Sequence, residues 1–402
     1  MSVHIKKVQG GITAVRGIEA AGVHCGLKKS GENDLALLYS REPAAAAGVF
    51  TTNKFRAAPL CVTQQHLAHP ARAIVINSGL ANACTGEQGL AAALRTTEIA
   101  AEELGICKEE VLVASTGVIG AYLPLDKIAR GINLAVQNLS PRGGTEAARA
   151  IMTTDTKIKE NAYRVATDTE SFTLAGMAKG AGMICPEMAT MLAFLVTDVQ
   201  IERAALQKAL QRAVDSSFNL ITVDGDTSTN DMVILLANGA AGLQIEEGGP
   251  LWDPFNRVLL QACRELAYAI VADGEGATKV IKLQVKGAPD REMARKLARA
   301  VLNSPLVKTA FFGEDANWGR IVTALGYTDV PFDPGQVDVF FGPLQVVAGG
   351  QGLFFDELQA KKILAQAEVP VLVDLHRGTA EVTAWGCDLS YEYVKINSAY
   401  RS

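Results

Sequence analysis

The chain has 402 residues, of which 49% are hydrophobic and 20% are charged, and its net charge is −5. This balance is typical of a folded globular protein. The chain lacks the surplus of basic residues that nucleic-acid binding requires. No apolar run approaches the roughly 18 residues of a membrane helix. Because the first residues also lack the apolar core of a signal peptide and the seven scattered cysteines fit reduced thiols, we expect a cytoplasmic protein that is long enough for two subdomains.

Short apolar runs separated by glycine-containing turns dominate the first 80 residues and predict short strands. These strands are expected within 11–27 and at 34–40, 46–53 and 73–79. Further strands are expected at 111–115, just before Thr116 and Gly117, as a pair within 163–184, and at 232–238.

Apolar residues recur with helical spacing in several longer segments. We expect helices at 88–104, 125–139, 144–152, 201–216, 251–271, 290–302 and 355–367, the last being the one helix of a final third that otherwise mixes strands and loops. Asp198 is a candidate N-cap for the helix at 201–216. This order of strands and helices predicts an α/β (α+β) fold of sheets packed with helices, with a subdomain border near 190–200.

Thr190 lies in the stretch KGAGMICPEMATMLAFLVTD, residues 179–198, where a loop with glycine and proline meets an apolar run. Strand structure explains a threonine there, because β-branched residues suit strands. A second explanation applies if the Ala189–Thr190 peptide bond is cut. The new α-amine, with a free pKa of roughly 7.7–8.0, can then act as the base for the threonine hydroxyl. The residues alone leave both interpretations open.

Other candidate sites carry weaker signals. His66 and His69 have helical spacing but no second cluster of ligands, so we expect them at the surface and expect no metal site. The acidic run 224–231 resembles a calcium loop in composition, yet Leu235 occupies the position that an EF-hand reserves for glutamate. Glu275, between glycines at a predicted helix end, is either a helix-terminus residue or a ligand contact. The sequence contains no P-loop and no GxSxG motif.

Ten blocks, in order along the whole chain, carry a family resemblance. They are GLKKSGENDLALLYS, AAAAGVFTTN, INSGLANACTGEQG, VASTGVIG, IMTTDT, KGAGMICPEMATMLAFLVTD, SFNLITVDGDTSTNDM, DGEGATK, GEDANWGRI and YVKINSAYRS. With these blocks the chain closely resembles the ArgJ family, the glutamate N-acetyltransferases that are also called ornithine acetyltransferases. The resemblance implies a self-processing ArgJ/DmpA-like fold. It also implies cleavage between Ala189 and Thr190 into an α chain, 1–189, and a β chain, 190–402.

The resemblance further implies a chemistry. Thr190 is the nucleophile, which takes the acetyl group of N2-acetylornithine as an ester and passes it to glutamate, in the cycle that recycles acetyl groups for arginine biosynthesis. Thr116 and Gly117 match the family's oxyanion-stabilising pair. The positions that match the family's substrate-binding residues are Thr153, Lys179, Thr190, Glu275, Asn397 and Ser402. No cofactor is implied, some members accept acetyl-CoA as a co-substrate, and the expected assembly is α2β2.

Two positions depart from the family pattern: Leu80 stands where asparagine is usual, and Ser402 stands where threonine is frequent, which keeps the hydroxyl. Members with and without acetyl-CoA activity are both compatible with the sequence. Two alternatives to the transferase remain. Self-processing aminopeptidases or amidohydrolases share the chemistry, but water discharges their acyl ester. A non-catalytic binding protein for small molecules would keep an uncut chain.

Overall fold

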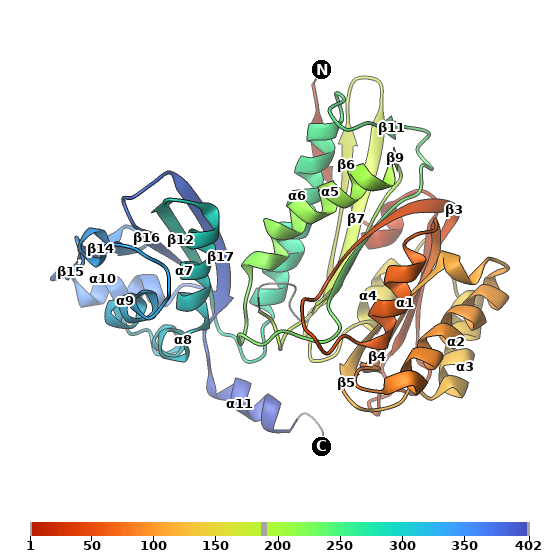
Figure 1. Cartoon of the computed structure of the whole chain (residues 1–402), viewed down its shortest axis with the longest axis horizontal. Coiled ribbons are helices and arrows are strands. Elements are labelled where there is room, and N and C mark those ends of the chain that lie inside the picture. The colour runs from red at the N-terminus through yellow and green to blue at the C-terminus, as the bar shows by residue number, and fades with distance from the viewer. Residues whose placement is uncertain (1, 186–190, 400–402) are drawn as a thin grey trace. The chain divides into compact units, whose positions relative to one another are not determined.

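A computed structural model describes residues 2–185 and 191–399, which form two compact units (Figure 1). Unit 1 consists of Met1–Gly180, Glu187–Asn219 and Thr227–Ile270, and unit 2 of Ala181–Pro186, Leu220–Asp226 and Val271–Ser402. The expected α/β class with helices packed on sheets is confirmed. The expected subdomain border near 190–200 is wrong, because two short segments on either side of it belong to unit 2 while the chain between them belongs to unit 1.

Unit 1 is built on a mixed sheet with nine described strands in the order β1-β6-β7-β8-β10-β3-β4-β5, with β2 also paired to β3. The strands are β1 (His4–Lys7), β2 (Ile18–Val23), β3 (Leu35–Phe50), β4 (Ala71–Leu80), β5 (Val111–Val118), β6 (Lys159–Ala166), β7 (Ser171–Lys179), β8 (Leu192–Thr197) and β10 (Met232–Ala237). Every residue of β8 and β10 is buried, as expected for strands that are covered on both faces.

Strand β3 is longer than the sequence indicates. The two expected strands, 34–40 and 46–53, are parts of one strand whose ladder with β4 shifts register between Tyr39 and Ala44. Up to this shift β3 pairs with β2 and β4, and from Ala45 onward it pairs with β10. Pro43 lies in the stretch where the partners change, and a residue without an N–H is tolerated there because no continuous ladder is interrupted.

Helices cover this sheet, and Figure 1 shows α1, α2 and α3 gathered beside β4 and β5. The helices are α1 (Ala58–His66), α2 (Gly86–Leu104), α3 (Leu125–Gln137), α4 (Gly144–Ala150), α5 (Arg203–Asp215) and α6 (Trp252–Ala272), the last two residues of α6 belonging to unit 2. A short strand pair, β9 (Gln200–Ile201) with β11 (Gln244–Ile245), completes the unit. None of the helices in the described part of the chain has the length and apolar character that a membrane span needs.

Two sequence predictions about unit 1 are wrong in a way that burial explains. His66, predicted at the surface, is buried in α1, a helix that the sequence did not predict, and its Nδ1 lies 2.7 Å from the carbonyl oxygen of Val111. Asp198 does not cap α5, because its carboxylate is buried and accepts a hydrogen bond from the N–H of Thr173. The N-cap is Glu202, whose side chain accepts from an N–H in the first turn.

Unit 2 contains a six-stranded sheet in the described residues, with the order β15-β14-β13-β16-β12-β17. The strands are β12 (Val280–Ala288), β13 (Asp338–Phe341), β14 (Leu344–Ala348), β15 (Gln351–Gly352), β16 (Glu368–Asp374) and β17 (Ala380–Cys387), and the helices are α7 (Arg291–Asn303), α8 (Pro305–Phe312), α9 (Trp318–Gly326), α10 (Glu357–Leu364) and α11 (Tyr391–Ser398). The prediction of one helix after residue 302 is therefore wrong. The short helices α8 and α9 begin at the N-caps Ser304 and Asn317, whose side chains accept backbone N–H groups.

Candidate active site

The candidate oxyanion pair, Thr116 and Gly117, lies near the end of β5, which runs parallel to β4. Gly117 is paired with Gly79 of β4, and the two residues have positive φ angles of 131° and 104°. A Cβ on Gly117 would lie 2.2 Å from the carbonyl carbon of Gly79, which no side chain can do. Glycine is therefore required here by both conformation and space. The backbone around Gly117 is fixed before any ligand binds, as an oxyanion-stabilising group has to be.

Lys179, the last residue of β7, brings its ammonium to the same strand end. Its Nζ donates to Oγ1 of Thr153 at 2.7 Å and to Oγ1 of Thr116 at 3.4 Å, and it lies 3.9 Å from the carboxylate of Asp155. The side chain is only 3% exposed, so water contributes little to its solvation. A compact ammonium held in this way between hydroxyl groups suits a small carboxylate as a ligand.

Asp155 is a central residue of this cluster that the sequence reasoning did not single out. Its Oδ1 accepts hydrogen bonds from Nζ of Lys159 at 2.7 Å and from the N–H of Gly180 at 2.6 Å, and its Oδ2 accepts from the N–H of Thr153 at 3.0 Å. Burial opposes its ionisation, but the charges of Lys179 and Lys159 outweigh burial and hold the pKa of Asp155 at about 2. Its one signal in the sequence is its place in the block IMTTDT, two residues after Thr153.

The cluster therefore sets two buried ammonium groups around one buried carboxylate. Buried charges need partners, and these three charged groups are partners for one another.

Glu275 and Asn397 are brought together within unit 2. The side-chain amide of Asn397, on α11, donates to Oε2 of Glu275 at 2.8 Å, and the N–H of Glu275 donates to the carbonyl oxygen of Ala181 at 2.8 Å. A Cβ on Gly182 would lie 2.3 Å from the Glu275 carboxylate, so the carboxylate packs directly on that glycine. Glu275 is thus a buried acid that three contacts hold in place. Its place at a helix terminus does not by itself explain these contacts.

Asp231 is a second acid that the sequence considered only as part of a calcium loop. It is fully buried, and its Oδ1 accepts a 2.9 Å hydrogen bond from the N–H of Met191. Burial raises its pKa well above the ordinary value, against the smaller opposing effect of this bond. The carboxyl group therefore holds the backbone one residue beyond Thr190, at the start of the apolar run.

Three predicted site residues, Ala189, Thr190 and Ser402, lie outside the described residues. Among the others, Thr116, Gly117, Thr153 and Lys179 lie together in unit 1, and Glu275 and Asn397 lie together in unit 2. Within the described ranges, no group of three or more His, Cys, Asp or Glu side chains could hold a metal ion. Leu80, the departure from the family pattern, uses its carbonyl oxygen to accept from the amide of Asn77.

The fold and the Lys179 cluster define the class of protein: an α/β protein with a buried, charged candidate site at the end of β5. The family follows from comparison. A model described as the ArgJ family matches residues 19–402, and the chain belongs to this family.

Curated relatives match over nearly their whole length. The arginine biosynthesis bifunctional protein ArgJ of Symbiobacterium thermophilum is 53% identical, with 98% of this chain and 99% of the relative aligned. The protein of the same name from Thermotoga neapolitana is 51% identical, over 96% and 99%. Among solved structures, the arginine biosynthesis bifunctional protein argJ of Bacillus halodurans is 42% identical with a TM-score of 0.50, covering 52% of this chain and 98% of its own.

Proposed function

We propose that the protein is a glutamate N-acetyltransferase of arginine biosynthesis, which moves the acetyl group of N2-acetylornithine to glutamate through an ester on Thr190. Membership of the ArgJ family supports acetyl transfer in this pathway. The observation that carries the proposal for this chain is the meeting of Thr116, Gly117, Thr153 and Lys179 at one strand end. These residues supply a carboxylate-binding ammonium beside a glycine turn suited to an oxyanion.

In the first half of the proposed reaction, the hydroxyl oxygen of Thr190 attacks the acetyl carbonyl carbon of N2-acetylornithine. The hydroxyl proton goes to the α-amine of Thr190, which is free once the chain is cut. Thr116 and Gly117 stabilise the negative charge that develops on the carbonyl oxygen, an effect worth about 3 kcal/mol for one such donor in other enzymes. The C–N bond then breaks, the leaving nitrogen takes the proton, and ornithine departs.

In the second half, the amine of glutamate attacks the ester carbon of acetylated Thr190 and gives up a proton to the α-amine of Thr190. The ester C–O bond breaks, the threonine oxygen regains a proton, and N-acetylglutamate leaves. Lys179 binds the carboxylate that both amino acids share, and Thr153 orients it. Glu275, Asn397 and Ser402 are retained as binding residues, with the acid of Glu275 suited to the side-chain ammonium of ornithine.

The proposal includes self-cleavage between Ala189 and Thr190 into 1–189 and 190–402. One comparison supports it: the solved chain from Bacillus halodurans is aligned over 98% of its length to 52% of this chain, so it is about half as long as the curated relatives. A family member present as a half-length chain is what a cut near the middle produces. The proposed fragment 190–402 is likewise slightly more than half of this chain.

The test is the Thr190→Ala variant beside the wild type, assayed with N2-acetylornithine and glutamate. We expect the wild type to form N-acetylglutamate and the variant to stay uncut and inactive. Turnover by the uncut variant would contradict the ester mechanism. Release of free acetate in place of N-acetylglutamate would favour the aminopeptidase or amidohydrolase alternative, and an uncut, inactive wild type would favour a binding protein.

Three further expectations belong to the same proposal. The curated relatives are named bifunctional, which supports a second activity in which acetyl-CoA acetylates glutamate directly. An assay with acetyl-CoA and glutamate tests it.

The assembly is proposed to be α2β2, which light scattering of the purified protein checks. A cytoplasmic location follows from a role in amino-acid biosynthesis, and cell fractionation tests it.

A further inference from the structure

Asn230 is a buried asparagine in the segment that leads into β10. Its Nδ2 donates to the carbonyl oxygen of Ala81 at 2.6 Å and to that of Ser115 at 2.8 Å. Its Oδ1 accepts a hydrogen bond from Oγ1 of Thr229 at 2.6 Å. The reverse orientation of this amide would set an oxygen against two carbonyl oxygens. The hydrogen bonds therefore fix which way the side chain points.

The bond to Ser115 acts directly on the candidate oxyanion pair. The carbonyl of Ser115 and the N–H of Thr116 belong to the same peptide group, which is planar. A hydrogen bond to the oxygen of this group limits the rotation of the whole group. Asn230 therefore holds Thr116 from the side of its own N–H.

The bond to Ala81 acts on the other side of the pair. The N–H of Ala81 donates to the carbonyl oxygen of Val118 at 2.9 Å, and Val118 directly follows Gly117. One side-chain amide thus holds the chain just before Thr116 and, through Ala81, the chain just after Gly117.

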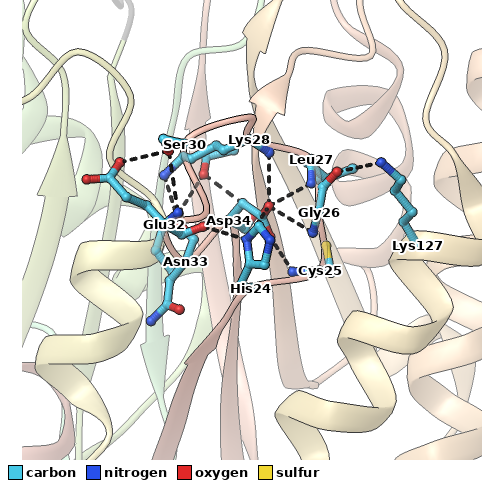
Figure 2. A network of polar contacts seen from close by, with 12 residues as sticks. His24, Cys25, Gly26, Leu27, Lys28, Ser30, Glu32, Asn33, Asp34 and Lys127 are labelled. Atoms are coloured by element: carbon cyan, nitrogen blue, oxygen red, sulfur yellow. Dashed lines mark hydrogen bonds and ion pairs between the residues drawn. The ribbon is translucent and has the colours of Figure 1, made fainter.

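The facing end of β4 has a separate support. Figure 2 shows the loop of residues 24–34 folded around the carboxylate of Asp34, which accepts backbone hydrogen bonds from Cys25, Gly26, Leu27 and Lys28. The N–H of Ser78 donates to the carbonyl oxygen of Asp34 at 2.9 Å. A Cβ on Gly79 would lie 3.5 Å from the carbonyl carbon of Leu27. Because this loop supports β4, loss of Asn230 should affect the β5 side of the turn first.

The residues after Asn230 hold the chain that follows the proposed nucleophile, Thr190. Oδ1 of Asp231 accepts from the N–H of Met191 at 2.9 Å, and the N–H of Met232 donates to the carbonyl oxygen of Met191 at 3.3 Å. Three consecutive residues therefore contact both the oxyanion turn and the first residue beyond Thr190.

The residues before Asn230 anchor this segment. Oγ1 of Thr51 donates to the carbonyl oxygen of Ser228 at 2.8 Å, and the N–H of Ala57 donates to that of Thr229 at 3.0 Å. The N–H of Asn230 donates to Oγ of Ser228 at 3.1 Å. The amide of Asn230 is thus carried on a backbone that is itself held in place.

The proposed reaction, on which this inference rests, needs donors that are oriented before charge develops on the acetyl oxygen. We propose that Asn230 is a positioning residue, which holds Thr116 and Gly117 at a fixed place relative to the chain that begins at Thr190. The charge on the acetyl oxygen develops only in the transition state. Loss of Asn230 should therefore lower kcat and leave substrate binding nearly unchanged.

The test variant is Asn230→Asp, which keeps the size of the side chain and replaces the donor nitrogen with oxygen. The matched control is Asn238→Asp, beyond the opposite end of β10. Asn238 is also buried, and its Nδ2 donates to the carbonyl oxygen of Arg16 at 2.9 Å and to Oγ of Ser40 at 3.3 Å. Its Oδ1 accepts from the N–H of Ala240 at 3.1 Å. Both substitutions therefore remove a buried amide with the same number of hydrogen bonds.

Steady-state kinetics with N2-acetylornithine and glutamate are measured on the cleaved proteins, beside thermal unfolding. We expect Asn230→Asp to lower kcat roughly 10- to 100-fold. KM should stay within about threefold, because both half-reactions pass through an oxyanion and slow together. Asn238→Asp should change kcat by less than about threefold, although both variants lose similar thermal stability. Asn230→Ala takes the place of Asn230→Asp if the latter fails to fold.

An unchanged kcat in a folded, cleaved Asn230 variant would overturn the inference. A raised KM with the kcat of the wild type would do so too, because Asn230 would then support substrate binding. An equal fall of kcat in Asn238→Asp would show a general effect of destabilisation. A folded Asn230 variant that stays uncut would also contradict the inference, since the residue would then serve chain cleavage and not turnover. A cleaved wild type without activity would instead refute the proposed function.

Discussion

The ammonium of Lys179 lies 2.7 Å from the hydroxyl of Thr153, although the two residues are 26 positions apart in the chain. This contact joins the end of β7 to the segment before β6 and fixes the cation in a buried place. A substrate carboxylate that binds there meets a donor that is already oriented, which reduces the entropy lost on binding.

Removal of the Lys179 charge should weaken both substrates. In Lys179→Met we expect KM to rise roughly 10- to 100-fold for N2-acetylornithine and for glutamate alike, because both lose the same charged contact. Steady-state kinetics with each substrate varied in turn measures this. A rise for glutamate alone would contradict a shared carboxylate site.

Asp155 should stabilise the fold in a pH-dependent way. Its pKa is about 2 in the folded protein against an ordinary 3.8, so the unfolded chain binds the proton first as the pH falls. Its contribution, about 2 kcal/mol, is therefore present above pH 4 and lost as the pH falls from 4 to 2.

Urea unfolding of the wild type and Asp155→Asn at pH 7 and pH 3 checks this. We expect Asp155→Asn to be less stable at pH 7, with the difference shrinking at pH 3. An equal difference at both pH values would show that the charge of Asp155 is not responsible.

Gly117→Ala should damage the oxyanion turn. The new Cβ would have to displace the backbone of Gly79, so we expect a large loss of thermal stability and a fall in kcat of at least about 100-fold in any folded fraction. Gly120→Ala is the matched control, because Gly120 also has a positive φ but has open space around its Cβ position. Similar losses in both variants would mean that backbone conformation, not the close contact, is decisive.

Asp231 should respond to pH in the opposite sense to Asp155. Because burial raises its pKa, its neutral form is favoured in the folded protein, and the wild type loses stability as the pH rises through that raised pKa. Asp231→Asn keeps an acceptor for the N–H of Met191 without a charge. We expect this variant to gain stability relative to the wild type as the pH rises above about 4, measured by thermal unfolding. A constant difference across that range would contradict the neutral carboxyl.

The sequence predicts regular elements well where periodicity is strong, as in α2 and α7, and less well where local chemistry gives a mixed signal. Strand β3 reads as two strands because Pro43 is typical of a turn, and only its partner strands explain its continuity. Helices α8 and α9 are short, so their caps are their main signal.

The site was predictable through resemblance and hardly at all through spacing. Thr116, Thr153 and Lys179 lie far apart in the chain, on β5, in the segment before β6 and at the end of β7, and only the tertiary fold brings them together. Asp155 carries no individual signal, because an acid among threonines is equally common in a surface turn. Its role depends on burial beside two lysines, which is a tertiary property.

The central claim is that Thr190 becomes an N-terminus and then carries the acetyl group. Intact-mass spectrometry of the purified wild type, with and without N2-acetylornithine, tests it beside Thr190→Ala. We predict two wild-type fragments, the second beginning at Thr190 and gaining the mass of one acetyl group on incubation, and a single unmodified chain for the variant. A wild-type chain that stays uncut, or a second fragment that never gains the acetyl group while N-acetylglutamate accumulates, would contradict the account.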